Sequence, residues 1–271
     1  MAVKITQEDA LKETGSRKKR NVFLMTVIFF SVSCQFLAPG REGTVIANCA
    51  DVVNAVSSLQ SGAPPQHLLD TGIKRGDEID VNQYFTVLDH VSMREGYTLD
   101  YVYVNESLGG FPLLYARLES QTPFGSMKDI PENTQLPDFR EYLEVDGMEL
   151  GYFEYVVLNT MANQFYLDWH ALYNDTEIVC NKDEVNAIIA DISDGSFGNP
   201  LDVAGQVKAR AMKNIEPAVQ LTGHDAIVEV IVFTKWGGFY RQTYTISRSF
   251  PHTIIDVKDE NLVPYDCGVM F

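Results

Sequence analysis

The sequence predicts an α+β domain in which an antiparallel sheet, built from about three hairpins, packs against about four helices. Three observations lead to this fold class. Pairs of strand-like stretches with alternating apolar residues flank short loops, as in hairpins. Other stretches place apolar residues three and four positions apart, as in amphipathic helices. Helical and strand-like stretches do not alternate in the order that a parallel sheet requires.

Two helices are predicted in the first half of the chain. Residues 47–62 carry apolar side chains at helical spacing and end at Gly62, before two prolines. Asp80 and Gln83 form a capping-box pattern, and the apolar residues behind them predict an amphipathic helix over residues 81–92.

Two more helices are predicted in the second half. Asn181 and Glu184 form a capping pattern before a helix that ends ahead of Gly195. Asn199-Pro200 opens a further helix that runs to about Met212, because proline is tolerated in the first helical turn.

Three hairpins account for the predicted sheet. Residues 97–119 form the first around a Gly-Gly loop, and residues 149–173 form the second. Residues 226–235 and 239–248 form the third, and 253–257 add a short strand. The stretch 226–235 is apolar on both faces apart from Glu229, which predicts a central strand.

Composition excludes some classes of function. The chain has 271 residues, 45% of them hydrophobic and 21% charged, as in an ordinary folded protein. Its formal net charge of −16 would repel phosphate backbones, so nucleic acid is not an expected partner.

The N-terminal segment carries the features of an export signal. Four basic residues, 17–20, precede an apolar run over residues 21–33, and Cys34 follows. A basic region before about a dozen apolar residues matches a secretory signal, and the run is shorter than the ~20 residues of a comfortable membrane span. We therefore expect a signal peptide over residues 1–33, a tether over 34–47 and one globular domain over 48–271.

Ser31-Val32-Ser33-Cys34 resembles the lipobox of bacterial lipoprotein precursors, although an aliphatic residue is usual where Ser31 stands. The resemblance covers residues 17–34 and implies cleavage before Cys34 and diacylation of that cysteine. The protein would then sit in the cell envelope, lipid-anchored on the extracytoplasmic side of the membrane. Plain secretion and an uncleaved signal anchor are the alternatives.

The other three cysteines are Cys49, Cys180 and Cys267. An extracytoplasmic protein can hold a disulfide, and we expect Cys180 to pair with Cys267 because both follow strand-like segments. Pairing of Cys49 with either one remains open. The sequence contains no CxxC pair or cysteine–histidine cluster, so neither a metal site nor a cofactor is predicted.

Common catalytic motifs are missing from the chain, including GxSxG, the P-loop, HExxH and GxGxxG. The candidate catalytic residues are Asp168 and His170, which would share one face of a strand and support general base chemistry. A solvated polar strand face explains the same pattern. The acidic segment 77–82 suggests Ca²⁺ but lacks the spacing and glycine of an EF-hand, and Asp80 is better explained as a helix cap.

Aromatic residues offer a second candidate surface. The predicted strands carry six tyrosines: Tyr97, Tyr101, Tyr103, Tyr115, Tyr240 and Tyr244. Exposed on a sheet, they could stack on carbohydrate or contact a protein, whereas a core in which hydroxyls reach the rim explains them equally.

The leading functional hypothesis is therefore a lipid-anchored binding module with a protein or carbohydrate ligand. The alternatives are an envelope hydrolase that uses carboxylates or the Asp168/His170 pair, and a structural component of an envelope assembly.

Overall fold

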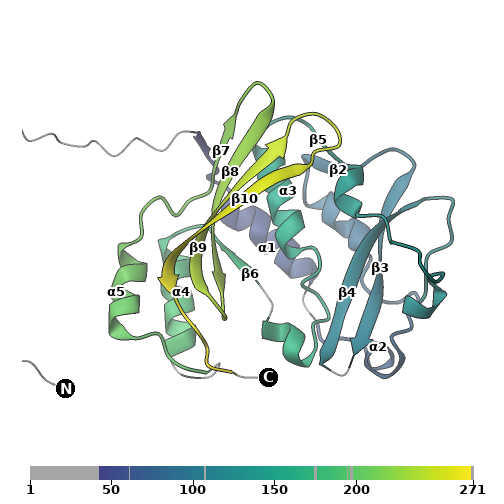
Figure 1. The fold of residues 1–271 in the computed structure, drawn as a ribbon, viewed down its shortest axis with the longest axis horizontal. Helices are drawn as coiled ribbons and strands as arrows, with labels where there is room; N and C mark the ends of the chain where they lie inside the picture. Colours follow the sequence, from purple (N-terminus) through teal and green to yellow (C-terminus); the bar gives the residue numbers. More distant parts are fainter. Residues whose placement is uncertain are drawn as a thin grey trace, which may run out of the picture. The chain divides into compact units, whose positions relative to one another are not determined.

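A computed structural model describes residues 43–60, 62–106, 108–173, 176–193, 195 and 198–269. The predicted signal peptide and Cys34 lie outside these residues. The described part is an α+β fold with a six-stranded antiparallel sheet and two two-stranded sheets, which confirms the predicted fold class (Figure 1).

Strand β8 is the centre of the large sheet. Its whole length pairs with β9, and its other edge pairs with β7 over residues 226–229 and with β6 over 231–234. β1 extends the sheet beyond β7, and β10 extends it beyond β9. The six strands are β1 (Thr44–Val45), β6 (Thr176–Val179), β7 (Ala218–Leu221), β8 (Asp225–Thr234), β9 (Gly238–Ser247) and β10 (Ile254–Pro264).

Helices cover both faces of this sheet (Figure 1). Side chains of β8 alternate between the two cores: Val228, Val230 and Val232 belong to one, Ile231 and Phe233 to the other. The first core includes α1 and α3, and the second includes α4 and α5. The helices on this sheet are α1 (Cys49–Leu59), α3 (Glu149–Met161), α4 (Lys182–Ser193) and α5 (Val203–Ala211).

A second group of elements packs on the far side of α3. Its largest part is the hairpin of β3 (Tyr97–Glu106) and β4 (Gly109–Leu118). The two strands pair along their whole length, from Tyr97 opposite Leu118 to Glu106 opposite Gly109. α3 also contacts the small sheet of β2 and β5. The remaining elements are α2 (Gln66–Thr71), β2 (Val91–Met93), β5 (Leu143–Val145) and the 3₁₀ helices η1 (Val81–Thr86), η2 (Met127–Asp129), η3 (Phe139–Tyr142) and η4 (Trp169–Tyr173).

The prediction of a hairpin over residues 149–173 is wrong. Residues 149–161 form α3, and the returning segment forms a turn and η4. Every residue from Gly151 to Leu158 is buried, so the segment shows no polar face that would reveal a helical period. Aromatic and β-branched residues in this run favoured a strand, but burial on all sides decided the structure. β7 and β8 form a further hairpin, whose first strand was not predicted.

Other boundaries also differ from the prediction. α5 begins at Val203, after its cap Asp202, and not at Pro200, and β10 extends to Pro264. η1 ends at Thr86, before β2, so residues 81–92 do not form one α-helix. Asp80 does cap η1, because its side chain accepts a hydrogen bond of 2.9 Å from Asn82 N. Thr44 and Val45, expected in the tether, pair with β7.

The structure joins Cys49 to Cys180, with 5.5 Å between their Cα atoms, and leaves Cys267 buried and free. The preferred Cys180–Cys267 pair was therefore wrong. Its two cysteines belong to the cores on opposite faces of the large sheet. Cys49 opens α1 and shares the core of Cys180, so the bond connects the start of α1 to the residue after β6.

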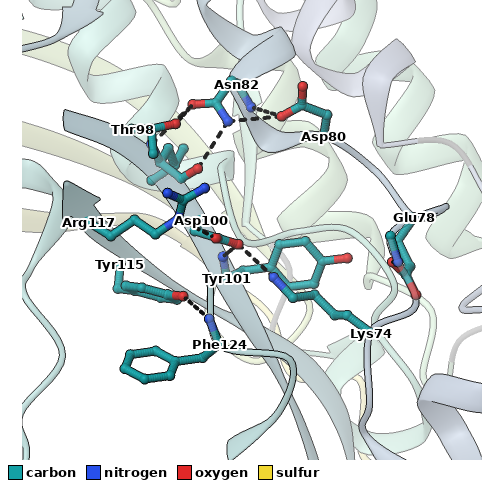
Figure 2. A network of polar contacts seen from close by, with 12 residues as sticks. Lys74, Glu78, Asp80, Asn82, Thr98, Asp100, Tyr101, Tyr115, Arg117 and Phe124 are labelled. Atoms are coloured by element: carbon teal, nitrogen blue, oxygen red, sulfur yellow. Dashed lines mark hydrogen bonds and ion pairs between the residues drawn. The ribbon is translucent and has the colours of Figure 1, made fainter. Parts of the chain in front are cut away.

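A buried ion network attaches two loops to the β3–β4 hairpin (Figure 2). Asp100 accepts hydrogen bonds from Lys74 Nζ at 2.6 Å and Arg117 Nε at 2.7 Å. Arg117 also donates to the carbonyl of Gln121 at 2.8 Å. All three charged side chains are less than a fifth exposed. The network thus fixes the loop that contains Lys74 and the turn after β4.

Neutral hydrogen bonds reinforce the same region (Figure 2). The Asn82 side chain donates to Leu99 O at 3.0 Å and accepts from Leu99 N at 3.1 Å, which ties η1 to β3. The Tyr115 hydroxyl accepts from Phe124 N at 3.0 Å, which holds the following loop against β4.

We predict that Cys49→Ala lowers the free energy of unfolding by about 2–5 kcal/mol, because the native disulfide closes a long loop. Urea unfolding with and without reductant measures this loss. The reductant should destabilise the wild type to a similar extent and leave Cys49→Ala unchanged. A Cys180–Cys267 peptide in a non-reducing digest would contradict the pairing.

We predict that Asp100→Ala costs about 3–5 kcal/mol, since it leaves two largely buried cations without their anion. Asp256→Ala is the matched control, because its contact with Lys258 is exposed and 3.9 Å long. The control should change stability by about 0.5 kcal/mol or less. Equal effects of the two substitutions in urea unfolding would refute the structural role of the network.

Candidate functional site

A groove of about 680 Å³ lies between β4, residues 127–140 and the end of α3. We call it the α3 groove. Its size falls within the range of about 300–1,000 Å³ that is typical of small-molecule sites. Both apolar and polar side chains line it, among them Leu113, Leu114, Phe139, Arg140, Asn159 and Asn163.

Each wall of the α3 groove has a local structural cause. β4 contributes one wall, where Leu113 is 40% exposed although it lies in the middle of the strand. Ala116 N donates to Pro137 O at 3.1 Å, which holds the irregular segment before η3 against β4. The last turn of α3 supplies Asn159, and the turn after it supplies Asn163. Rigid elements therefore frame the groove on at least two sides.

An ion pair stands at one end of the α3 groove. The Arg140 Nε donates to both Asp138 oxygens at 2.9 Å, and Nη1 donates to Asn159 Oδ1 at 3.3 Å. Burial raises the pKa of Asp138, but its hydrogen bonds with Arg140 outweigh burial and lower the pKa below its usual value. The pair is therefore ionised at neutral pH and contributes no net charge to the groove.

The same ion pair borders a second cavity of about 260 Å³, lined also by Glu141, Tyr155, Pro251, Thr253 and Ile254. Burial raises the pKa of the Tyr155 hydroxyl to about 12, so this side chain stays neutral there. Asp138 and Arg140 thus separate two hollows whose walls include only one exposed acidic side chain beyond the pair, Glu141.

A third cavity, of about 310 Å³, lies beside the Asp100 network. Lys74, Asp100 and Arg117 line it, but their charged groups are already engaged with one another. The Tyr101 ring lies 4.5 Å from Lys74 Nζ, which adds a cation–π contact. The charged residues that line this cavity therefore hold the two loops against the β3–β4 hairpin.

Asp168 and His170 do not occupy a strand face. Asp168 precedes η4 and donates its backbone N–H to Gly110 O at 2.9 Å. His170 lies within η4 and packs its ring edge-on against Trp169, with centroids 4.1 Å apart. Neither residue lines any of the three cavities described above. The strand geometry from which their shared face was predicted is therefore wrong.

The six tyrosines do lie on strands, but they do not form an open aromatic face. Tyr101, Tyr103, Tyr115 and Tyr244 are at least nine-tenths buried. Tyr103 donates to Tyr166 O at 2.8 Å, so its hydroxyl anchors the segment after α3. The core interpretation of these four residues is confirmed.

Sequence reasoning missed the α3 groove. Its walls come from three separate segments, and one of them is the misassigned α3. The signals in the sequence were Leu113 within an apolar strand and the Asp138-x-Arg140 spacing after Pro137, and neither indicates a cavity without the fold.

No helix in the described part of the chain combines the length and apolar character that a membrane crossing needs. Comparisons of the chain with protein-family models, with curated proteins and with solved structures find no match.

Proposed function

We propose that this protein is a lipid-anchored extracytoplasmic binding protein, and that the α3 groove holds an uncharged, partly apolar ligand of small-molecule size. The observation that carries the proposal is the composition of the groove wall. It combines exposed apolar surface with side-chain amides and an ion pair that is already neutralised. Such a wall binds apolar surface and orients it with a few hydrogen bonds.

The charge of the protein supports an uncharged ligand over an anionic one. Residues 1–33 hold six basic and three acidic side chains, so cleavage after them would change the net charge from −16 to −19. Arg140 is the cation in the groove wall, and Asp138 occupies its guanidinium. An anionic ligand would therefore find no available cation there and would meet a repulsive overall field.

The cysteines support the extracytoplasmic location. The Cys49–Cys180 disulfide fits an oxidising compartment, where such bonds persist. The acidity of the exported residues opposes electrostatic attachment to anionic lipids, which favours a covalent anchor at Cys34 over surface adsorption.

The hydrolase alternative has less support, because Asp168 and His170 line none of the three cavities described here. The structural alternative would need an extended apolar surface. A large exposed apolar side chain outside the groove, such as Val203 at 77%, is common on soluble proteins and does not by itself indicate an assembly.

A matched pair of fluorescent probes tests the groove. We expect the neutral N-phenyl-1-naphthylamine to bind saturably and at least about tenfold more tightly than its sulfonated relative 1-anilinonaphthalene-8-sulfonate, a difference of ~1.4 kcal/mol. The two probes share most of their ring system and differ chiefly in charge. Leu113→Asp should lower the affinity for the neutral probe by a similar factor, because it places a carboxylate on the apolar wall.

Leu118→Asp is the control for this experiment. Leu118 lies on the same strand and is 46% exposed, but it does not line the groove. Equal loss of probe binding in the Leu113 and Leu118 variants, or tighter binding of the sulfonated probe, would contradict the proposed ligand class.

The anchor has a separate test. We expect Cys34→Ser, expressed in a bacterium with its lipoprotein-processing enzymes, to leave the membrane fraction or to accumulate as an unprocessed precursor. Cys267→Ser is the control, since that cysteine is buried in the folded domain. Unchanged size and unchanged membrane retention of Cys34→Ser, measured by fractionation and immunoblotting, would reject lipidation.

A further inference from the structure

Three side chains of the types that bind metal ions meet where α2 approaches the loop between α2 and η1. His67 offers one ring nitrogen, and Asp77 and Glu78 each offer one carboxylate oxygen. These three atoms lie within 4.8 Å of one another. His67 Nε2 lies 2.5 Å from Glu78 Oε1, and their side chains are 11% and 3% exposed. Asp77 is exposed. We propose that His67, Asp77 and Glu78 form a binding site for a divalent transition-metal ion, with Zn²⁺ as the best match.

The donor set favours zinc over calcium. One imidazole nitrogen and two carboxylate oxygens are common zinc ligands, and three protein ligands leave a fourth position of a tetrahedral site for water. Calcium takes six to eight oxygen ligands and does not select imidazole. The acidic segment that suggested calcium from the sequence thus supplies two ligands of a different site, and α2 supplies the third.

The fold holds this loop in position before any ion binds. Arg75 N and Gly76 N donate to the two oxygens of Glu78 at 2.6 and 2.8 Å. Lys74, next to them, is held by the buried Asp100. The backbone donors can remain in place as outer-sphere support for a bound ion.

An orphaned hydroxyl points toward the same loop. Tyr101 is 2% exposed, and its Oη has no hydrogen-bond partner among the described residues. Figure 2 shows this hydroxyl directed toward the side on which Glu78 lies. Burial raises the pKa of Tyr101, and the charge of Glu78 raises it further. A water on the fourth position of a bound ion is the type of partner that this donor lacks.

Binding would open the His67–Glu78 hydrogen bond. Zinc lies about 2.0–2.2 Å from nitrogen and oxygen ligands in proteins, so the ion would stand between His67 Nε2 and Glu78 Oε1. Tetrahedral ligand atoms lie about 3.4 Å apart at those bond lengths. The His67–Glu78 contact must therefore open slightly, and the exposed Asp77 must approach by a side-chain rotation.

Isothermal titration of the purified chain with Zn²⁺ at pH 7.5, together with metal-dependent thermal shift, tests the site. We expect one equivalent to bind and to raise the melting temperature. His67→Gln should lower the affinity for Zn²⁺ at least about tenfold. The protein should remain folded, because the glutamine amide can still donate a hydrogen bond to Glu78. Asp77→Asn should also weaken it, since this exposed residue contributes only to the site. His224→Gln, an exposed histidine elsewhere, should bind as the wild type does.

Three results would overturn the proposal. The first is an absence of Zn²⁺ binding by the wild type. The second is binding that both His67→Gln and Asp77→Asn leave unchanged. The third is stabilisation by Ca²⁺ without any by Zn²⁺. Probe binding at the α3 groove uses other residues, so either proposal can fail while the other stands.

Discussion

The structure depends on the burial of α3 over residues 151–158. This helix contacts β6, β7 and β8 of the large sheet, and it also contacts the small sheet of β2 and β5. Its one buried carboxylate, Glu154, accepts a hydrogen bond of 2.8 Å from His90 N, which fixes the segment before β2. Burial raises the pKa of Glu154. The hydrogen bond from His90 N offsets part of the cost of burying this carboxylate. Loss of α3 would remove the contact between the large sheet and the small sheet of β2 and β5, and it would remove one wall of the α3 groove.

Elements with a clear amphipathic period could be predicted from the sequence. α1 and α4 each have one buried stripe, and the β3–β4 and β8–β9 hairpins alternate around short loops. α3 could not be predicted because burial on every side removes the periodic contrast. The same error placed Asp168 and His170 on a strand, whereas Asp168 precedes η4 and His170 lies within it. The Cys49–Cys180 bond was open in the sequence because pairing depends on which sheet face each cysteine occupies.

The candidate sites illustrate the same limit. The α3 groove combines residues from β4, η3 and α3, and the proposed zinc site combines α2 with a loop ten residues later. Asp138 with Arg140 and Asp77 with Glu78 are visible as short charged strings, but their partners are not adjacent in the chain. Neutralisation of Arg140 by Asp138 underlies the proposed ligand class, because it leaves an apolar and amide-lined wall on a strongly acidic protein.

Backbone amide NMR during titration with N-phenyl-1-naphthylamine tests the central claim most directly, because it locates the bound molecule without a substitution. The account predicts that chemical-shift changes concentrate on β4, on residues 127–140 and at the end of α3, around Leu113, Phe139 and Asn163. Changes concentrated on α4 and α5, or no saturable changes at all, would contradict the assignment of the α3 groove as the binding site.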